Sequence, residues 1–271
     1  MYVDLHLHSV FSDGTENPRS IVERAKNIGL DAISLTDHDT VLGTGEMFAA
    51  AEEFGIKCIS GIEISAIKDG EVHILGYGMD VNSPGLQSEL RRLAEMRRDR
   101  NKGILEKLKK YHVYISEAEI ADPKGNASIG RSHIAKAMVR RGYTKNINEA
   151  FDRWLGYGKP AYLPSFRVSP EEAIALVSKY GKLSVLAHPC QLKTPKAGLE
   201  GFLKALKDCG LGGIEAFYST HKEAETKEYL SLAKKLDLQV TCGSDFHGFG
   251  RIAEIGGVKG EVSREMIESL L

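Results

Sequence analysis

Short apolar runs alternate with amphipathic stretches along most of this chain. The runs with the length and residue content of strands are YVDLHLH, DAISLTD, KCISGIEIS, VHILGYG, LSVLAHP, GGIEAFY and LQVTCGSD. The stretches with helical periodicity are PRSIVERAKNIG, GEMFAAAEEFG, PEEAIALVSKYG and HKEAETKEYLSLAKKL. Several of these helices stop at a glycine, the usual residue of a left-handed C-terminal cap. A strand followed by a helix, repeated along the chain, predicts an α/β fold with a mostly parallel sheet or barrel.

The rhythm changes between residues 86 and 164. LQSELRRLAEMRRDRNKGILEKLKKY is one long, charged helical stretch, and SIGRSHIAKAMVRRG follows as another helix. We therefore predict a helical insertion, residues 86–164, within an α/β domain made by residues 1–85 and 165–271. Many of the chain's arginines fall in this insertion, where most are expected to lie on a solvated helix face.

Composition limits the classes of partner. The 271 residues are 42% hydrophobic and 27% charged, which is typical of a globular protein. Lys and Arg number 36 against 37 Asp and Glu, so a long nucleic-acid track, which needs a basic stripe, is not expected. No apolar run reaches the roughly 20 residues that span a bilayer, and the N-terminus has no basic segment followed by an apolar one. We expect no membrane partner and a cytoplasmic location.

Cysteine spacing excludes two further kinds of site. The four cysteines, Cys58, Cys190, Cys209 and Cys242, lie far apart and form no C-x-x-C pair. Neither a thiolate zinc site nor a disulfide framework is therefore indicated.

Histidines and carboxylates gather at the ends of the predicted strands. His6 and His8 are two apart on the first strand, so their side chains point to the same face. The other residues at or beside predicted strand ends are Asp13, His38, Glu63, His73, His188, Asp245 and His247. In parallel α/β folds, ligands bind at the carboxyl ends of the strands.

Each of these residues also has an ordinary explanation. His73 in an apolar run resembles a hydrogen-bonded core histidine, and Glu63 alone would be a salt-bridged residue. Asp13 before a glycine is a common turn pair, and Asp37 and Asp39 could cap the following helix. The combination decides between these explanations, because H-x-H, D-H-D and S-D-x-H are each uncommon and all fall at one edge of the sheet. We predict a metal site there.

The ordered motifs DLHLHSVFSDGT, LTDHDT, GIEIS, HILGYG, LAHP and GSDFHG resemble those of the PHP (polymerase and histidinol phosphatase) metal-dependent phosphoesterases over nearly the whole chain. The resemblance implies a distorted parallel β/α barrel with an inserted helical subdomain and up to three divalent metals at the strand ends. Similar family members act on nucleoside monophosphates, 3',5'-bisphosphonucleotides or the 5' end of short RNA.

Carried over residue by residue, the resemblance implies nine metal ligands. They are His6, His8, Asp13, His38, Glu63, His73, His188, Asp245 and His247. The implied grouping is one metal on His6, His8 and Asp245, a second on His73 and His188 bridged by Glu63, and a third on Asp13, His38 and His247. Asp13, His38, Asp245 and His247 are also assigned to catalysis.

Six imidazoles with three carboxylates suit two to three ions of manganese, iron or zinc better than magnesium or calcium, which prefer oxygen shells. A hydroxide between two such metals is a strong nucleophile, so hydrolysis of a phosphate monoester is the predicted reaction. A metal-dependent amidohydrolase or deaminase is the alternative, and a non-catalytic metal-binding module is a second one. The release of inorganic phosphate from a phosphate ester would distinguish the phosphoesterase from both alternatives.

Three residues of the insertion are candidates for binding the phosphate. GRSHIA supplies Arg131 and His133, and GYGKPAY supplies Lys159. An Arg binds phosphate oxygens bidentately and a Lys supplies a point charge. Relatives often have R-P-H-I-A here, so Ser132 replaces a proline. The competing explanation is surface charge beside a helix histidine.

Overall fold

The computed structural model describes residues 1–121, 128–164, 168–192, 196–248 and 253–271. The chain folds as two compact units. Unit 1 contains Met1–Gln87 and Val168–Leu271, and unit 2 contains Ser88–Arg167. Helix α3 (Pro84–Lys109) begins in unit 1 and continues into unit 2.

Unit 1 is built on one sheet whose strands lie side by side in chain order. The strands are β1 (Val3–Leu7), β2 (Ala32–Leu35), β3 (Lys57–Ile67), β4 (Glu71–Tyr77), β5 (Leu183–Leu186), β6 (Gly213–Tyr218) and β7 (Gln239–Gly243). Strands β1 to β3 are parallel, as are β5 to β7, whereas β4 is antiparallel to both of its neighbours. Every apolar run predicted to be a strand forms one, and the α/β class is confirmed.

The reversal at β4 follows from the short connection before it. The backbone N–H of Lys68 donates to the carbonyl of Gly70 at 2.9 Å, and Asp69 and Gly70 have φ of 53° and 154°. A turn this tight can join only antiparallel strands. Its consequence is functional, because the beginning of β4, with His73, lies at the same sheet edge as the carboxyl ends of the parallel strands.

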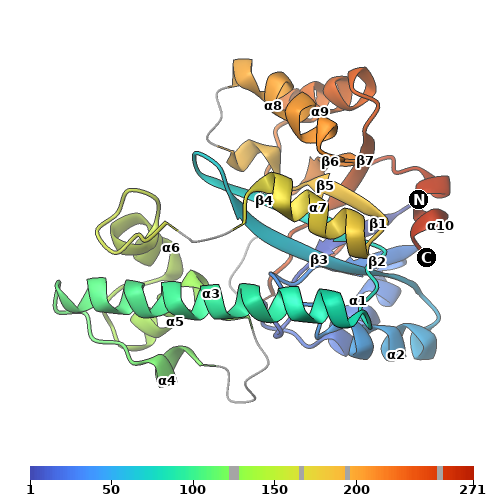
Figure 1. Cartoon of the computed structure of the whole chain (residues 1–271). Coiled ribbons are helices and arrows are strands. Elements are labelled where there is room, and N and C mark those ends of the chain that lie inside the picture. Colours follow the sequence, from blue (N-terminus) through green and yellow to red (C-terminus); the bar gives the residue numbers. More distant parts are fainter. Residues whose placement is uncertain (122–127, 165–167, 193–195, 249–252) are drawn as a thin grey trace. The chain divides into compact units, whose positions relative to one another are not determined.

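The two ends of the sheet approach each other and nearly close a barrel (Figure 1). The backbone N–H of His8 donates to the carbonyl of Phe246 at 2.9 Å, and that of Asp245 donates to His6 at the same distance. These bonds fix the segment after β7 against the end of β1. Two motifs at opposite ends of the sequence are thereby placed side by side.

Helices cover the sheet of unit 1 (Figure 1). They are α1 (Pro18–Ile28), α2 (Thr44–Phe54), α7 (Pro170–Tyr180), α8 (Lys196–Asp208), α9 (Glu223–Lys235) and α10 (Arg264–Leu270). The side chain of Asn17 caps α1 by accepting from the backbone of Ser20, and Gly29 with φ of 84° ends that helix. The sequence patterns predicted α1, α2, α7 and α9, but neither α8 nor α10.

Strand β1 shows how the core and the site share one element. Val3, Leu5 and Leu7 belong to the apolar clusters of unit 1, with 0–1% of their surface exposed. The alternate residues Asp4, His6 and His8 are just as buried. Because successive side chains of a strand point to opposite faces, β1 has one apolar face and one polar face, both away from water.

Unit 2 is helical and has an apolar core of its own. After α3 come α4 (Glu117–Ile120), α5 (Arg131–Arg140) and α6 (Ile147–Ala150), the last continued by a π-helical turn, Phe151–Leu155. The core includes Ile104, Leu108, Ile134, Met138 and Leu155. Among the described residues of both units, no helix is long and apolar enough to cross a membrane.

Candidate metal centre

The structure brings together all nine residues predicted to bind metal, at one edge of the sheet in unit 1. His6 comes from β1, Glu63 from β3 and His73 from β4, while the others, His8 among them, follow β1, β2, β5 and β7. Each of the nine lies within 3.5 Å of another through side-chain nitrogen and oxygen atoms.

Glu63 lies at the centre of this cluster and is 1% exposed. Its Oε1 is 2.7 Å from Nδ1 of His73 and 2.9 Å from Nε2 of His188. Its Oε2 is 2.9 Å from Nδ1 of His38, 3.2 Å from Nε2 of His8 and 3.5 Å from Nε2 of His6. One carboxylate therefore contacts five imidazoles that come from four different parts of the chain.

Two further carboxylates complete the cluster. Oδ1 of Asp245 is 3.1 Å from Nε2 of His8 and 3.4 Å from Nε2 of His6. Oδ1 of Asp13 is 3.1 Å from Nε2 of His247 and 3.8 Å from Nε2 of His38. The loop after β1 thus places Asp13 beside the motif that follows β7.

Among the residues that the structure describes, three groups have donor atoms close enough to share an ion. They are His8, Asp13, His38 and His247; His6, His8 and Glu63; and His38, Glu63 and His73. In each group the donor atoms lie within 4.8 Å of one another. The chemistry of the donors, imidazole nitrogen and carboxylate oxygen, is that of sites for divalent metals.

The carboxylate at the centre of the cluster is held in its ionised form, so the site favours a bound cation. Burial alone would raise the pKa of Glu63, but His38, His73 and His6 lower it well below its usual value. Burial alone would lower the pKa of His8, but Asp245 and Glu63 raise it to about 10. For His38, burial dominates and lowers the pKa to about 4, so its ring is neutral near pH 7.

Several buried atoms of the cluster are oriented for a ligand other than a hydrogen-bond partner. Nε2 of His6, Nε2 of His8, Nδ1 of His38 and Oε2 of Glu63 make no hydrogen bond within the described chain, although they face one another at short range. Buried polar atoms are normally hydrogen-bonded, so this set is unusual. The residues present therefore fit a divalent metal.

Backbone strain accompanies the site. His188 has φ of 25° and Asp245 has φ of 57°, a region that residues with a side chain seldom adopt. Each residue lies two positions after a strand that ends at the cluster, His188 after β5 and Asp245 after β7. Strain of this kind persists only where the surrounding contacts fix the conformation.

Asp37 does not cap helix α2, which the sequence suggested as one explanation. Helix α2 begins at Thr44 after Gly43. Asp37 instead accepts from the backbone N–H of Ser9 at 2.8 Å and from the hydroxyls of Ser9 and Ser12 at 2.6 and 2.5 Å. It thereby holds the loop that carries Asp13.

Two buried residues beside the cluster were not predicted. Glu215 and Tyr218 lie on β6, a strand that supplies none of the nine residues, and both make hydrogen bonds to residues of the cluster. A glutamate inside the apolar run GGIEAFY was the only signal in the sequence.

The three phosphate-binding candidates all lie in unit 2. Arg131 and His133 are in the first turn of α5, and Lys159 is exposed in the loop after the π-helical turn. The guanidinium of Arg131 lies 5.4 Å from the ring centre of Phe151 and donates to the carbonyl of Leu155 at 3.2 Å. Nδ1 of His133 accepts from the backbone N–H of Gly130 at 3.2 Å, which leaves the ring proton on Nε2.

A nearly closed α/β barrel with imidazoles and carboxylates converging at the carboxyl ends of its strands defines the class of metal-dependent hydrolases built on barrels. The family follows from comparison with known proteins. The PHP domain model matches residues 4–163, and the chain belongs to the PHP family.

The relatives cover almost the full chain. A 5'-3' exoribonuclease from Haemophilus influenzae is 32% identical over 248 residues, 90% of this chain and 89% of its own length. A phosphoribosyl 1,2-cyclic phosphate 1,2-diphosphodiesterase from Eggerthella lenta is 32% identical over 263 residues, 94% of this chain and 98% of its own. A crystal structure from Bifidobacterium adolescentis, assigned as a metal-dependent phosphoesterase, has a TM-score of 0.88 at 31% identity and covers 99% of this chain and 94% of its own.

Proposed function

We propose that this protein is a metal-dependent phosphoesterase that hydrolyses phosphate esters of nucleotides or of the 5' end of short RNA. The observation that carries the proposal is the convergence of six imidazoles and three carboxylates on one buried edge of the barrel. The relatives support it, because those named above are by name an exoribonuclease, a diphosphodiesterase and a metal-dependent phosphoesterase.

The nine residues of the cluster would hold two to three ions of manganese, iron or zinc. Glu63 is the natural bridging ligand, because its two oxygens face different sets of histidines. We retain His6, His8 and Asp245 for one ion, His73 and His188 for a second, and Asp13, His38 and His247 for a third. When bound, such metals supply a hydroxide nucleophile and neutralise charge on the phosphoryl oxygens.

The contacts of the residues proposed for catalysis support that assignment. The ring of His38 is neutral near pH 7, because burial lowers its pKa to about 4, so it keeps a lone pair for a ligand. Nδ1 of His247 donates to the backbone carbonyl of Asp245 at 2.8 Å, which directs Nε2 towards Asp13. Asp13 and Asp245 each present Oδ1 to the histidines around them.

Arg131, His133 and Lys159 are proposed to bind the phosphate of the substrate. The support is chemical: a guanidinium and an imidazole N–H in the first turn of a helix, where backbone N–H groups also favour anions, and an exposed ammonium. The alcohol half of the ester is left open, since one relative acts on RNA by name and another on a phosphoribosyl cyclic phosphate.

The test is a product assay with a defined panel. Nucleoside monophosphates, 3',5'-bisphosphonucleotides, 5'-phosphorylated short RNA, a phosphoribosyl cyclic phosphate and sugar phosphates are each incubated with manganese, iron and zinc. Hydrolysis of at least one nucleotide or RNA substrate is expected. If no phosphate ester is cleaved with any metal, the proposal is wrong and a metal-dependent amidohydrolase becomes the better hypothesis.

The substrate-binding residues have a separate test. Arg131→Ala and Lys159→Ala are expected to lower kcat/KM by about tenfold to a hundredfold, mainly through KM, since each charge-assisted contact stabilises bound phosphate by roughly 1.5 to 3 kcal/mol. Metal content should stay unchanged. Arg98→Ala, an exposed arginine of α3 in unit 2, is the control. Kinetics equal to the parent in both variants would contradict this role.

A further inference from the structure

Strand β6 carries two polar side chains that face the cluster without belonging to it. Glu215 has no exposed surface, and Tyr218 is 6% exposed. Both contact residues that the proposed function treats as metal ligands, so their bonds bear on how those ligands are oriented.

Glu215 uses both carboxylate oxygens on the cluster. Oε1 lies 2.9 Å from Nδ1 of His6, and Oε2 accepts from the backbone N–H of His188 at 2.7 Å. A carboxylate only accepts, so the proton of the His6 ring is on Nδ1. The lone pair of Nε2 is then directed towards Glu63 and Asp245, at 3.5 and 3.4 Å. The bond to His188 also fixes a residue whose φ of 25° is strained.

Tyr218 orients a different residue of the cluster. Its hydroxyl donates to Oδ2 of Asp245 at 2.8 Å and accepts from Nε2 of Gln191 at 2.7 Å. Because Oδ2 is engaged, Oδ1 is the atom that faces His6 and His8. Asp245 is also strained, with φ of 57°, so an external bond to its side chain helps to define its position.

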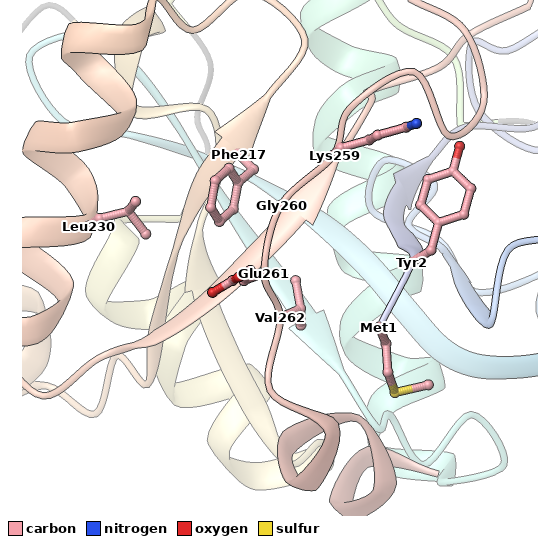
Figure 2. Close-up of a pocket in the computed structure, with 8 residues that line it drawn as sticks. All are labelled: Met1, Tyr2, Phe217, Leu230, Lys259, Gly260, Glu261 and Val262. Atoms are coloured by element: carbon pink, nitrogen blue, oxygen red, sulfur yellow. The ribbon is translucent and has the colours of Figure 1, made fainter.

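A bulge places these two side chains on one face of the strand. Residues three apart in a regular strand point to opposite faces. Here Glu215 pairs with Thr241 of β7 and Phe217 pairs with the next residue, Cys242, so β6 contains one extra residue. Phe217 consequently points the other way, into a pocket beside Gly260 and Val262 (Figure 2), while Tyr218 returns to the face of Glu215. Bulges beside functional sites commonly redirect a side chain in this way.

Strand β7 leaves the space that this arrangement needs. A Cβ on Gly243, which pairs with Tyr218, would overlap the Cβ of His6 and Oε1 of Glu215. The contact between Glu215 and His6 therefore requires a glycine at this position. The pair of polar side chains, the bulge in β6 and the glycine in β7 all contribute to the contacts with the cluster.

We infer that β6 is a positioning strand for the metal site: Glu215 sets the tautomer of His6 and the backbone of His188, and Tyr218 sets which oxygen of Asp245 faces the ions. The inference rests on the proposed function, since it concerns the affinity of this chain for divalent metal. Neither residue touches the substrate in this assignment.

The test compares Glu215→Gln and Tyr218→Phe with the parent protein. The apparent Kd for Mn²⁺ and for Zn²⁺ is measured by chelator competition, and thermal unfolding is followed in EDTA. Glu215→Gln turns an acceptor into a donor facing either His6 or His188, and Tyr218→Phe removes one hydroxyl and keeps the ring. Each variant is expected to bind metal about 10- to 100-fold more weakly, which is the typical effect of removing a residue that hydrogen-bonds a metal ligand.

A spectroscopic signature separates positioning from general destabilisation. Long-range ¹H–¹⁵N correlation spectra of the protein loaded with Zn²⁺, which is diamagnetic, should show the His6 proton on Nδ1 in the parent and a smaller share of this tautomer in Glu215→Gln. Ser184→Ala is the matched control, because Ser184 is a buried polar residue of the neighbouring strand β5 that bonds the carbonyl of Gly210 instead of the cluster. Its metal affinity should equal that of the parent.

The outcomes distinguish this inference from the proposed function. If the parent binds metal and both variants bind it equally well, the inference is overturned while the phosphoesterase proposal stands. If the parent binds neither metal, the proposed function itself fails. If Glu215→Gln does not fold, the metal affinity of Tyr218→Phe alone tests the inference, because this substitution keeps the packed ring and removes only the hydroxyl. A loss of affinity in Tyr218→Phe with unfolding in EDTA unchanged supports the inference.

Discussion

Glu63 is the residue on which most of the site depends. It is a buried carboxylate in the middle of a strand, and the imidazoles of His38, His73 and His188 lie within 3 Å of its oxygens. Removing its charge leaves these rings without their common partner. A buried group that loses its partner costs more than the contact itself contributed.

Glu63→Gln is therefore expected to lower the turnover number for the best phosphate ester by more than roughly 100-fold. Substituting a residue that only hydrogen-bonds a metal ligand typically costs roughly 10- to 100-fold. The protein should stay folded, because the side chain keeps its size. Steady-state kinetics and circular dichroism of the same preparation check both points. Turnover within about tenfold of the parent would remove Glu63 from the site.

Asp4 provides a test of pH dependence at a single residue. Its Oδ1 accepts from the backbone of Ser244 and its Oδ2 from that of Gly256, yet burial raises its pKa from 3.8 to about 6. A carboxyl with a raised pKa binds protons more tightly in the folded state. Its ionisation therefore destabilises the fold, and this loss develops as the pH rises through 6.

We expect the free energy of unfolding of the parent, relative to Asp4→Asn, to increase by about 1 kcal/mol as the pH falls from 7 to 5. Denaturant unfolding of both proteins in EDTA measures it, since the chelator removes any contribution from metal release. A difference that stays constant, or that decreases towards pH 5, would contradict the assignment.

At the scale of elements, the loop between β1 and α1 is held in place by Asp37 from the segment after β2. This one carboxylate accepts from one backbone N–H and two hydroxyls, and it is 2% exposed. The loop has no regular ladder of its own to satisfy these donors, so the position of Asp13 depends on Asp37.

Asp37→Ala should lower the free energy of unfolding by about 2 to 4 kcal/mol, because buried donors lose their acceptor. Metal affinity should fall as well, as Asp13 is no longer fixed. Asp31→Ala, which removes one exposed hydrogen bond to the backbone of Tyr2, is the control and should cost less than about 1 kcal/mol. Similar losses in the two variants would show that Asp37 does not anchor the loop.

At the scale of the whole molecule, the cluster joins elements from both ends of unit 1. The segment after β7 binds the end of β1 through two backbone hydrogen bonds, and the carboxylates and histidines of the same segments face one another. A ligand bound there contacts residues from Met1–Gln87 and from Val168–Leu271 at once. Such a ligand stabilises the folded state alone.

Loading with Mn²⁺ or Zn²⁺ at about 100 times the Kd should add roughly 2.7 kcal/mol to the stability and raise Tm by roughly 5 to 10 °C relative to protein in EDTA. Differential scanning calorimetry over a metal titration measures the shift. Mg²⁺ at the same free concentration should raise Tm much less, because the donors are mostly nitrogen. An equal response to all three ions would contradict the predicted metal preference.

The sequence by itself determined the local structure and the inventory of the site. Apolar alternation predicted each strand, and histidine and carboxylate motifs at strand ends indicated nine residues that the fold brings together. These are short-range properties, because a few consecutive residues determine the period of a strand and the position of its end. The same patterns did not predict helices α8 and α10.

Only the tertiary structure decided which partners surround those residues. His6 and Glu215 are 209 positions apart, Ser9 and Asp37 are 28 apart, and Tyr218 and Asp245 are 27 apart. No periodicity within one element encodes such contacts, since they depend on strand order, on the reversal at β4 and on the bulge in β6. The chemistry of the site was visible in the residues, whereas the tautomers and orientations that make them usable come from packing across the sheet.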